Sequence, residues 1–529
     1  MNNITIVILL LTVITALSEL THRIKIPYPI LLVLVGIVIG LIPGLPTVSL
    51  DPDLVFLIFL PPVLYSAAWQ TSWPDFKADL RPISLLAIGC VLFTTTMIAL
   101  IAHTLIPGFG WAESFILGAI ISPPDAVAAS AATKGLGVPK RIITILEGES
   151  LVNDATGLIA YRYAVAAAGT GTFVFWLAGA NFFYVAILGI AIGLGMGFVF
   201  YWIHKITPDN PTNDTVLTFI APYASYLTAE HFHASGVLAV VVMGVFLSPR
   251  ASIVFNHQAR LQAYNVWDTV MFILNGLIFI LIGLQLPVIM SQLGKFTLWE
   301  AIGYGALISG ATIILRIIWV FPSHYIPKWF LAKARKQDTE LNSKSITVIA
   351  WSGMRGVVSL AAALALPLTI NNNPFPNRDI ILFITFAVIF STLVLQGLTL
   401  PKLIQWLGIK PDGKEEKQEF DARLRVAASI IEHIEENYAL SLSDTVLSQI
   451  KAKYEIRIEK MRQESVRKMT NEQVDEYVRI QNDLLSAERK FVLDLRKSRV
   501  IGDEVHRKLE YELDLEEERL SLERDQPTL

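Results

Sequence analysis

The sequence predicts an all-α membrane protein, with about thirteen transmembrane helices in an inverted repeat, two discontinuous crossing helices, and a helical cytoplasmic domain at the C-terminus. Three observations support this fold class. The 529 residues are 53% hydrophobic and only 17% charged, which is too apolar for a soluble globular protein of this size. The apolar residues gather in runs of membrane length. Two of these runs are interrupted by proline or glycine beside a charged residue.

The composition also excludes several classes of partner and site. A net charge of −3 offers no basic surface for nucleic acid, so no nucleic-acid partner is expected. Cys90 is the one cysteine, which rules out an internal disulfide framework, and its apolar surroundings predict a buried thiol. The first residues, Met1-Asn2-Asn3, lack the basic region of a cleaved signal peptide, so the first apolar run is expected to remain as a span.

Thirteen apolar runs approach or exceed the roughly 17–25 residues that a membrane span needs. The eighth and ninth are short and closely spaced. In chain order the runs cover residues 3–20, 28–44, 53–70, 82–105, 112–133, 142–168, 173–204, 214–230, 234–249, 264–290, 298–321, 345–370 and 379–408.

The loops between these runs predict an orientation, because Lys and Arg concentrate in cytoplasmic loops. Loops that follow odd-numbered spans contain fifteen Lys and Arg residues, whereas the opposite loops contain only Lys295 and Arg378. We therefore expect a multi-pass protein of the plasma (inner) membrane, with its N-terminus outside and its C-terminus in the cytoplasm. The alternation of Lys- and Arg-rich loops with Lys- and Arg-poor loops also supports the number of spans, because one missed span would reverse the pattern partway along the chain.

Two domains are expected, because the chain changes character near residue 410. Residues 1–409 form the predicted transmembrane domain. Residues 410–529 are rich in charge, contain no proline between Pro411 and Pro527, and place apolar residues three and four apart. This pattern predicts amphipathic helices broken near residues 441–443, Thr470 and Gly502. A domain that packs on itself or a second copy and a regulatory domain both fit, and the two are compatible.

The fifth and twelfth spans carry helix-breaking sequences. Ser122-Pro123-Pro124 interrupts the fifth, because proline removes a backbone donor and clashes with the preceding turn. Ser352-Gly353-Met354-Arg355-Gly356 interrupts the twelfth. The two lie an odd number of spans apart and cross the membrane in opposite directions, which fits an inverted repeat of residues 1–168 and 214–408. Such repeats bring discontinuous helices to a binding site at the membrane midplane.

Two aspartates lie at membrane depth in adjacent spans: Asp125 beside the first break, and Asp154 in the sixth span. A charge at bilayer depth costs about 2.5–3.5 kcal/mol on insertion scales, so it persists where it is paired or used. At 100° per residue, Ser150 and Asp154 share one helix face and can face Asp125. Burial disfavours the charged form of a carboxyl group. We therefore expect a cation and a proton to compete for Asp154, with Asp125 and Ser150 as further oxygen ligands.

Glu149 points about 140° away from Asp154 and needs a cationic partner of its own. The basic residues deep in other spans are Arg316 in the eleventh and Arg355 in the twelfth. We expect Glu149 and Arg316 to form a buried strut. Half-helix ends carry partial charges, so Asp125 is expected to offset the positive ends at the crossing and Arg355 the negative ends.

The other polar residues are given structural interpretations. Glu147 is expected to reach toward the cytoplasmic end of the sixth span, and Arg162 to lie near its outer end. His231 and His233 do not form a cluster with metal-ligating geometry, so no zinc site is expected. No cofactor is expected beside the transported ions.

Taken in order, these motifs resemble the monovalent cation:proton antiporter-1 family, the sodium/proton exchangers, in a bacterial-type member. Arg316 in the eleventh span belongs to the matching pattern. The segments that carry the resemblance are residues 59–65 (Phe-Leu-Pro-Pro-Val-Leu-Tyr), 122–128 (Ser-Pro-Pro-Asp-Ala-Val-Ala), 148–154 (Gly-Glu-Ser-Leu-Val-Asn-Asp), 353–356 (Gly-Met-Arg-Gly) and 512–520 (Glu-Leu-Asp-Leu-Glu-Glu-Glu-Arg-Leu).

The resemblance implies a thirteen-span homodimer in lipid, in which a core domain moves against a dimerisation domain. It puts Asp125, Ser150 and Asp154 at the ion site, with Asp154 carrying the cation or the proton. It also matches Glu149 and Arg316 to the family's buried ion pair.

Three positions bear on the kind of exchange that the resemblance implies. Asn153 stands where electrogenic relatives have a second aspartate, which implies electroneutral one-for-one exchange and groups Asn153 with the ion-binding residues. Many members have a threonine before the aspartate of the fifth span and an acid after the motif in the third. Here Pro124 and Ser66 occupy these positions, so ion selectivity and affinity do not carry over from the family.

The predicted function is therefore exchange of Na⁺ or Li⁺ for H⁺ by alternating access, linked to pH regulation. K⁺/H⁺ exchange is the main alternative. An intramembrane aspartyl protease also uses two aspartates on neighbouring spans, but Asn153 before Asp154 departs from its Gly-x-Gly-Asp site. A channel with a helical regulatory tail would not need two opposed broken helices. No enzymatic activity is expected.

Overall fold

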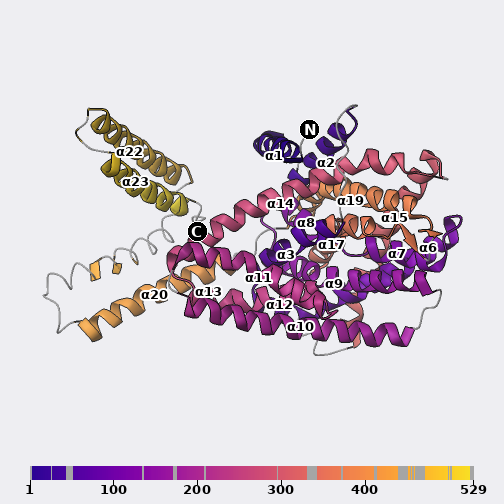
Figure 1. The fold of residues 1–529 in the computed structure, drawn as a ribbon. Coiled ribbons are helices and arrows are strands. Elements are labelled where there is room, and N and C mark those ends of the chain that lie inside the picture. The colour runs from indigo at the N-terminus through magenta and orange to yellow at the C-terminus, as the bar shows by residue number, and fades with distance from the viewer. Residues whose placement is uncertain are drawn as a thin grey trace. The chain divides into compact units, whose positions relative to one another are not determined.

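The computed structural model consists almost entirely of helices, in two compact units, Met1–Pro411 and Asp412–Leu529 (Figure 1). The structure describes residues 3–24, 27–42, 52–133, 136–170, 175–207, 210–294, 296–330, 342–370, 373–409, 414–438, 451–452, 454–455, 458, 471–498, 500 and 503–524.

Helices of the first unit follow the predicted apolar runs closely. Their N-termini show why they begin where they do: Asn210, Ser235 and Asn256 each accept hydrogen bonds from backbone N–H groups of the first turn that follows. The helices up to the middle of this unit are α1 (Asn3–Ile24), α2 (Tyr28–Gly40), α3 (Pro52–Gln70), α4 (Trp73–Ala78), α5 (Leu80–Ser84), a π-helical stretch η1 (Leu85–Cys90), α6 (Val91–Leu105), α7 (Trp111–Ile121), α8 (Ala126–Thr133), α9 (Lys140–Thr170) and α10 (Phe175–Ile206).

The rest of the first unit contains the second broken helix. Its elements are α11 (Pro211–His231), α12 (Gly236–Leu247), a 3₁₀ turn η2 (Ser248–Arg250), α13 (Ala251–Val254), α14 (His257–Ser291), α15 (Leu298–Phe330), α17 (Ser343–Trp351), α18 (Val357–Leu364), the strands β1 (Thr369–Ile370) and β2 (Asn373–Pro374), and α19 (Arg378–Leu407). The two strands pair antiparallel, with Thr369 opposite Pro374.

Both predicted helix breaks are present. The chain leaves helical geometry between α7 and α8, at Ser122-Pro123-Pro124-Asp125, and again between α17 and α18. Several boundaries differ from the prediction. The tenth run was expected to begin at residue 264, but α14 begins at His257, and the eleventh was expected to end at residue 321, but α15 continues to Phe330. The twelfth run was expected to continue to residue 370, but α18 ends at Leu364. Pro367 explains this last difference, because a proline disfavours helical geometry in the residue before it.

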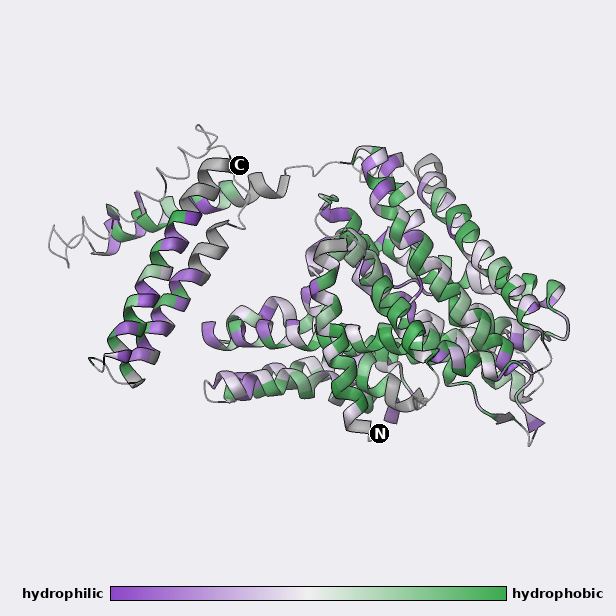
Figure 2. Ribbon diagram, turned by 90° about the horizontal axis from the view of Figure 1, so that it is seen from above, coloured by the Kyte–Doolittle hydropathy of each residue, from purple (hydrophilic) through white to green (hydrophobic). Residues whose placement is uncertain are grey.

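Hydropathy identifies the first unit as a mostly helical membrane protein. Among the described residues, seven helical stretches are long and apolar enough to cross a membrane, and three shorter apolar helices accompany them. Hydrophobic residues predominate along these helices, with hydrophilic residues interspersed (Figure 2). Closely packed glycines bring some of them together: a Cβ atom on Gly36 of α2 would lie 2.3 Å from the carbonyl oxygen of Ile280 in α14, a close approach that small residues permit.

The second unit contains amphipathic helices. They are α20 (Lys414–Tyr438), α22 (Asn471–Lys497) and α23 (Asp503–Arg524). Leu485 of α22 and Leu513 of α23 are buried together, and Arg489 bridges Asp514 and Glu517 across the pair, with contacts of 2.8 and 2.5 Å. The predicted breaks at residues 441–443, Thr470 and Gly502 lie outside the described residues.

Candidate functional site

The two helix breaks lie against each other in the interior of the first unit. The backbone N–H of Asp125, at the first break, donates a hydrogen bond of 2.7 Å to the carbonyl oxygen of Met354, at the second. Non-helical backbone at membrane depth is tolerated where it is buried in protein or lines a cavity. Here each break supplies a partner for the other, so four half-helices end at one place.

The carboxylate of Asp125 lies at the N-terminal ends of two of these half-helices. Its Oδ1 accepts a hydrogen bond of 2.8 Å from the N–H of Val127, in the first turn of α8. Its Oδ2 lies against Gly356, the residue before α18, so closely that a Cβ atom on Gly356 would be 1.9 Å away. Helix N-termini carry partial positive charge and unpaired N–H groups. Asp125 therefore has the position that the sequence analysis gave it.

Arg355 lies at the opposite, carbonyl ends. Its Nε donates a hydrogen bond of 2.6 Å to the carbonyl oxygen of Ile121, the last residue of α7. Its Nη1 donates one of 2.7 Å to the carbonyl oxygen of Gly353, just after α17. The side chain is only 1% exposed, so these carbonyl dipoles are its immediate surroundings. This placement also agrees with the sequence analysis.

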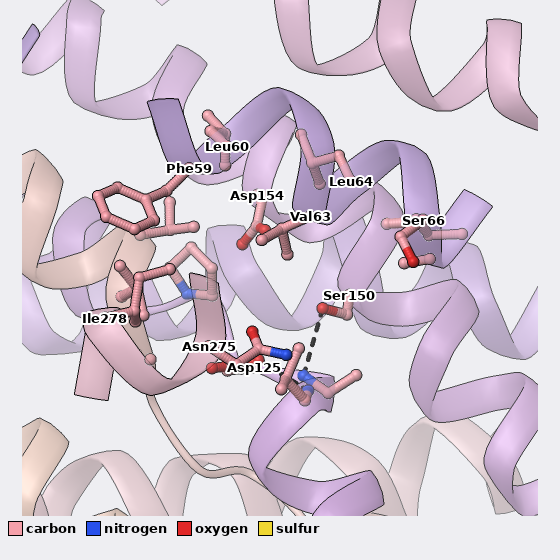
Figure 3. Close-up of a pocket in the computed structure, with 18 of the residues that line it drawn as sticks. Phe59, Leu60, Val63, Leu64, Ser66, Asp125, Ser150, Asp154, Asn275 and Ile278 are labelled. Atoms are coloured by element: carbon pink, nitrogen blue, oxygen red, sulfur yellow. Dashed lines mark hydrogen bonds between the residues drawn. The ribbon is translucent and has the colours of Figure 1, made fainter. Parts of the chain in front are cut away.

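A cavity of about 270 Å³ opens beside the crossing. Asp125 and Asp154 both line it. So does Ser150, a residue of α9 that faces the start of α8 (Figure 3). Residues of α3, α8, α9, α14 and α18 form its walls. Asp154 is 8% exposed. The polar side chains around the cavity are those of Ser66, Gln70, Asp125, Ser130, Glu147, Ser150, Asp154, Asn275 and Ser359.

Ser150 links α9, the predicted sixth span, to the break between α7 and α8. Its Oγ accepts a hydrogen bond of 3.3 Å from the N–H of Ala126, the first residue of α8, drawn as the dashed line in Figure 3. One of its lone pairs is thus used locally, and a hydroxyl oxygen has two. Asp125, Ser150 and Asp154, which the sequence analysis grouped, are brought together around one cavity.

Asn153 does not belong to that group in the structure, although it was expected there. It is fully buried, it is not among the residues that line the cavity, and its Nδ2 donates a hydrogen bond of 2.7 Å to the carbonyl oxygen of Pro124. Adjacent residues of a helix point about 100° apart, so Asn153 cannot share the face of Asp154. Asn153 satisfies a carbonyl that the helix break leaves free.

The expected ion pair behind the cavity is present. Arg316 of α15 donates hydrogen bonds of 2.6 and 2.8 Å to the two carboxylate oxygens of Glu149, and both side chains are 1% exposed. A third bond, of 3.1 Å, runs from Arg316 to the carbonyl oxygen of Ile349 in α17. The pair therefore ties α9 to α15 and α17. Arg162 instead bonds Glu230 near the surface, at 2.8 Å.

Part of the cavity lining was not predicted from the sequence: Asn275 of α14 and Gln70 of α3 both line it. Ser66 of α3, noted above as the position where many family members have an acid, lines it as well. Glu147 also lines it, whereas it was expected only to reach the cytoplasmic end of its span. Two signals in the sequence could have found these residues. Glu147, Ser150 and Asp154 follow one helix face at three- and four-residue spacing, and Asn275 is a polar residue in an apolar run.

Comparison with known proteins identifies the family and agrees with the fold. The chain matches the family described as "Sodium/hydrogen exchanger, transmembrane" over residues 7–406. It is 32% identical to the uncharacterised Na⁺/H⁺ exchanger YjcE of Escherichia coli, over 96% of this chain and 97% of that protein. It is 34% identical to the sodium, potassium, lithium and rubidium/H⁺ antiporter of Bacillus pumilus, over 75% of this chain and 60% of that protein.

The fold is also similar to that of a solved structure. The sodium proton antiporter MjNhaP1 of Methanocaldococcus jannaschii aligns with a TM-score of 0.60 and 18% identity, over 76% of this chain and 98% of that one. At this level of identity the likeness concerns the fold. The family match, in contrast, spans nearly all of the helical membrane unit. The chain belongs to the sodium/hydrogen exchanger family of membrane transporters.

Proposed function

We propose that this protein exchanges Na⁺ or Li⁺ for H⁺ across the membrane by alternating access, one for one, with Asp154 holding the cation and the proton in turn. The observation that carries the proposal is that Asp125 and Asp154 line one cavity where two broken helices meet. The sodium/hydrogen exchangers named among the relatives support the choice of ions.

Competition between the two ions follows from the surroundings of Asp154. A buried carboxylate without a partner is costly, so a protonated and a cation-bound carboxyl group are both favoured over the empty charged form. Within the described residues no hydrogen bond joins Asp154 to another side chain. Asp125, in contrast, is held by backbone N–H groups, which favour its charged form. Only a site occupied by one ion or the other crosses between the two faces.

Electroneutral exchange follows if one carboxyl group changes occupancy per cycle. Asp125 compensates the helix ends throughout the cycle, and Asn153 carries no charge and bonds the Pro124 carbonyl. One Na⁺ then replaces one proton on Asp154. The transported charge is equal in the two half-cycles, so the membrane potential does not drive the exchange.

The remaining architecture is proposed on the same basis. Thirteen crossings, with the N-terminus outside and the C-terminal unit in the cytoplasm, fit the distribution of Lys and Arg along the sequence. Residues 1–168 and 214–408 form the two repeats, and the cytoplasmic residues 410–529 are a regulatory helical tail. The protein acts as a homodimer in the inner membrane, among its lipids, and takes part in pH regulation.

Proteoliposomes that contain a pH dye test the exchange directly. A gradient of Na⁺ or Li⁺ is expected to drive proton movement, and K⁺ is compared because the Bacillus pumilus relative is named for it. Asp154→Asn is expected to abolish the signal while the purified variant keeps its thermal unfolding midpoint. Full activity of Asp154→Asn would remove this residue from the mechanism. A response to an imposed membrane potential would rule out one-for-one exchange.

A further inference from the structure

The cavity extends well beyond the two aspartates along α9. Glu147 and Asp154 are seven residues apart, so they share one face of the helix, about 20° apart, and are separated by roughly 10 Å along its axis. Both line the cavity. A cation bound at Asp154 is therefore too far away for Glu147 to coordinate. Glu147 requires an explanation of its own.

The end of the cavity near Glu147 contains other polar side chains. Gln70 is the last residue of α3, and Ser130 lies in α8, which leads into α9 through a short loop. Arg141 in the first turn of α9 binds Asp79, the residue after α4, at 2.7 Å. The short segment that follows α3 is therefore tied to the start of α9. Gln70, Ser130 and Glu147 all line the cavity.

These side chains have no partners in the described part of the chain. No hydrogen bond or ion pair there involves the side chains of Glu147, Gln70 or Ser130, or that of Ser66 one turn before Gln70. Ser66 is buried, Glu147 and Ser130 are partly exposed, and Gln70 is exposed, so water reaches this end of the cavity. The four side chains offer one negative oxygen pair and three neutral oxygens toward one space, which suits a monovalent cation that keeps part of its water.

We propose that Glu147, with Ser66, Gln70 and Ser130, forms a second cation site, which we call the outer site, between the aqueous phase and the exchange site at Asp125 and Asp154. This inference rests on the proposed exchange of Na⁺ for H⁺. The outer site draws Na⁺ from one face of the membrane and supplies it to Asp154. Because its other ligands are neutral, it binds weakly and releases the ion inward. It binds Na⁺ that arrives from the side of the membrane where α9 begins at Lys140, and not Na⁺ that arrives from the other side.

The test compares Na⁺ supplied from one side of the membrane with Na⁺ supplied from the other. Initial rates of Na⁺-driven proton movement are measured in vesicles of both orientations while the Na⁺ concentration is varied. Glu147→Gln is expected to raise the KM for Na⁺ about tenfold, which corresponds to about 1.4 kcal/mol, only when Na⁺ is supplied from the Lys140 face. The maximal rate stays within about twofold. Glu147→Asp is expected to restore most of the affinity, because it keeps the charge.

Asp75→Asn is the matched control. Asp75 is half-exposed, pairs with Lys140 at 3.8 Å on the same face, and does not line the cavity, so its loss removes a charge without touching the outer site. Its KM for Na⁺ should equal that of the wild type. Gln70→Leu provides a second probe that leaves every charge in place, and its KM should rise about threefold from the same face.

Three results would overturn the outer site. The first is an unchanged KM from both faces in Glu147→Gln and Gln70→Leu. The second is an equal rise in KM from both faces. The third is complete loss of exchange in a folded Glu147→Gln protein, which would assign this residue to the exchange site itself. Absence of cation-driven proton movement in the wild type would overturn the proposed function and the outer site together.

Discussion

The contact between Asp125 and Gly356 determines where the negative charge of the exchange site lies. Gly356 precedes α18, and the space that a Cβ atom would need there is occupied by the carboxylate of Asp125. The backbone of the second break thus fits directly against a side chain of the first. A glycine at this position is required by the close approach, because its φ is negative and demands no unusual backbone.

Gly356→Ala is expected to reduce exchange strongly while the protein still folds. The added Cβ would lie 1.9 Å from Oδ2 of Asp125, so the carboxylate must rotate away from the N-termini of α8 and α18. Loss of a charge-assisted hydrogen bond costs about 1.5–3 kcal/mol, which is about 10- to 150-fold in cation affinity. Na⁺-driven proton movement in proteoliposomes measures the effect.

Gly303→Ala serves as the control for this variant. Gly303 lies in α15, and a Cβ atom there would meet nothing within 4 Å, so its exchange activity should equal that of the wild type. Wild-type KM for Na⁺ in Gly356→Ala would show that Asp125 tolerates displacement, and would argue against its role at the exchange site.

At the scale of helices, the sequence predicted the breaks but not the whole cavity. Ser122-Pro123-Pro124 and the glycines around Arg355 mark the breaks because proline and glycine act locally, through backbone geometry. Gln70 and Asn275 were missed because their role depends on how α3 and α14 are rotated. That rotation is set by packing against other helices, such as the close contact of Gly36 with α14. It therefore cannot be predicted from the sequence of one helix.

The misplacement of Asn153 has the same origin. Its neighbour Asp154 faces the cavity, and a family resemblance alone gives no information on which side of α9 each residue occupies. The helix break creates a free carbonyl at Pro124, and the side chain of Asn153 in α9 reaches it. The angle of 100° between neighbouring residues already predicts that Asn153 and Asp154 point in different directions. The partner of Asn153, however, depends on how α8 packs against α9, which the sequence does not state.

The pair of Glu149 and Arg316 is expected to stabilise the packing of α9 against α15 only while both partners are present. Arg316→Met leaves the Glu149 carboxylate buried without a partner, which costs about 3–5 kcal/mol. Glu149→Gln combined with Arg316→Met removes both charges and should recover most of that loss. Thermal unfolding midpoints of the detergent-purified variants measure the difference.

Arg162→Met provides the comparison for an exposed pair. Arg162 binds Glu230 at 2.8 Å, but its side chain is 51% exposed, and exposed pairs contribute about 0–1 kcal/mol. If Arg316→Met were no less stable than Arg162→Met, the buried pair would not act as a strut. If the double variant were as unstable as the single one, shape and not charge would explain the loss.

For the whole membrane unit, the cavity exists only when the two proposed repeats come together. The helices α3, α8 and α9 supply one part of its wall, and α14 and α18 supply the other. Asp125 makes contacts in both parts, through α8 and through Gly356. Asp125 therefore fixes the two parts to each other at the crossing of the broken helices.

Labelling of introduced cysteines determines which end of the cavity faces the cytoplasm. The single native thiol, Cys90, is buried, so the parent chain should not react with a membrane-impermeant maleimide. Lys77 in α4 and Ser291 at the end of α14 are both exposed and fall in loops of opposite predicted sides. In intact cells Ser291→Cys should label at once, whereas Lys77→Cys should label only after the membrane is permeabilised. The reverse pattern would invert the orientation, and the outer site at Glu147 would then draw cations from outside the cell.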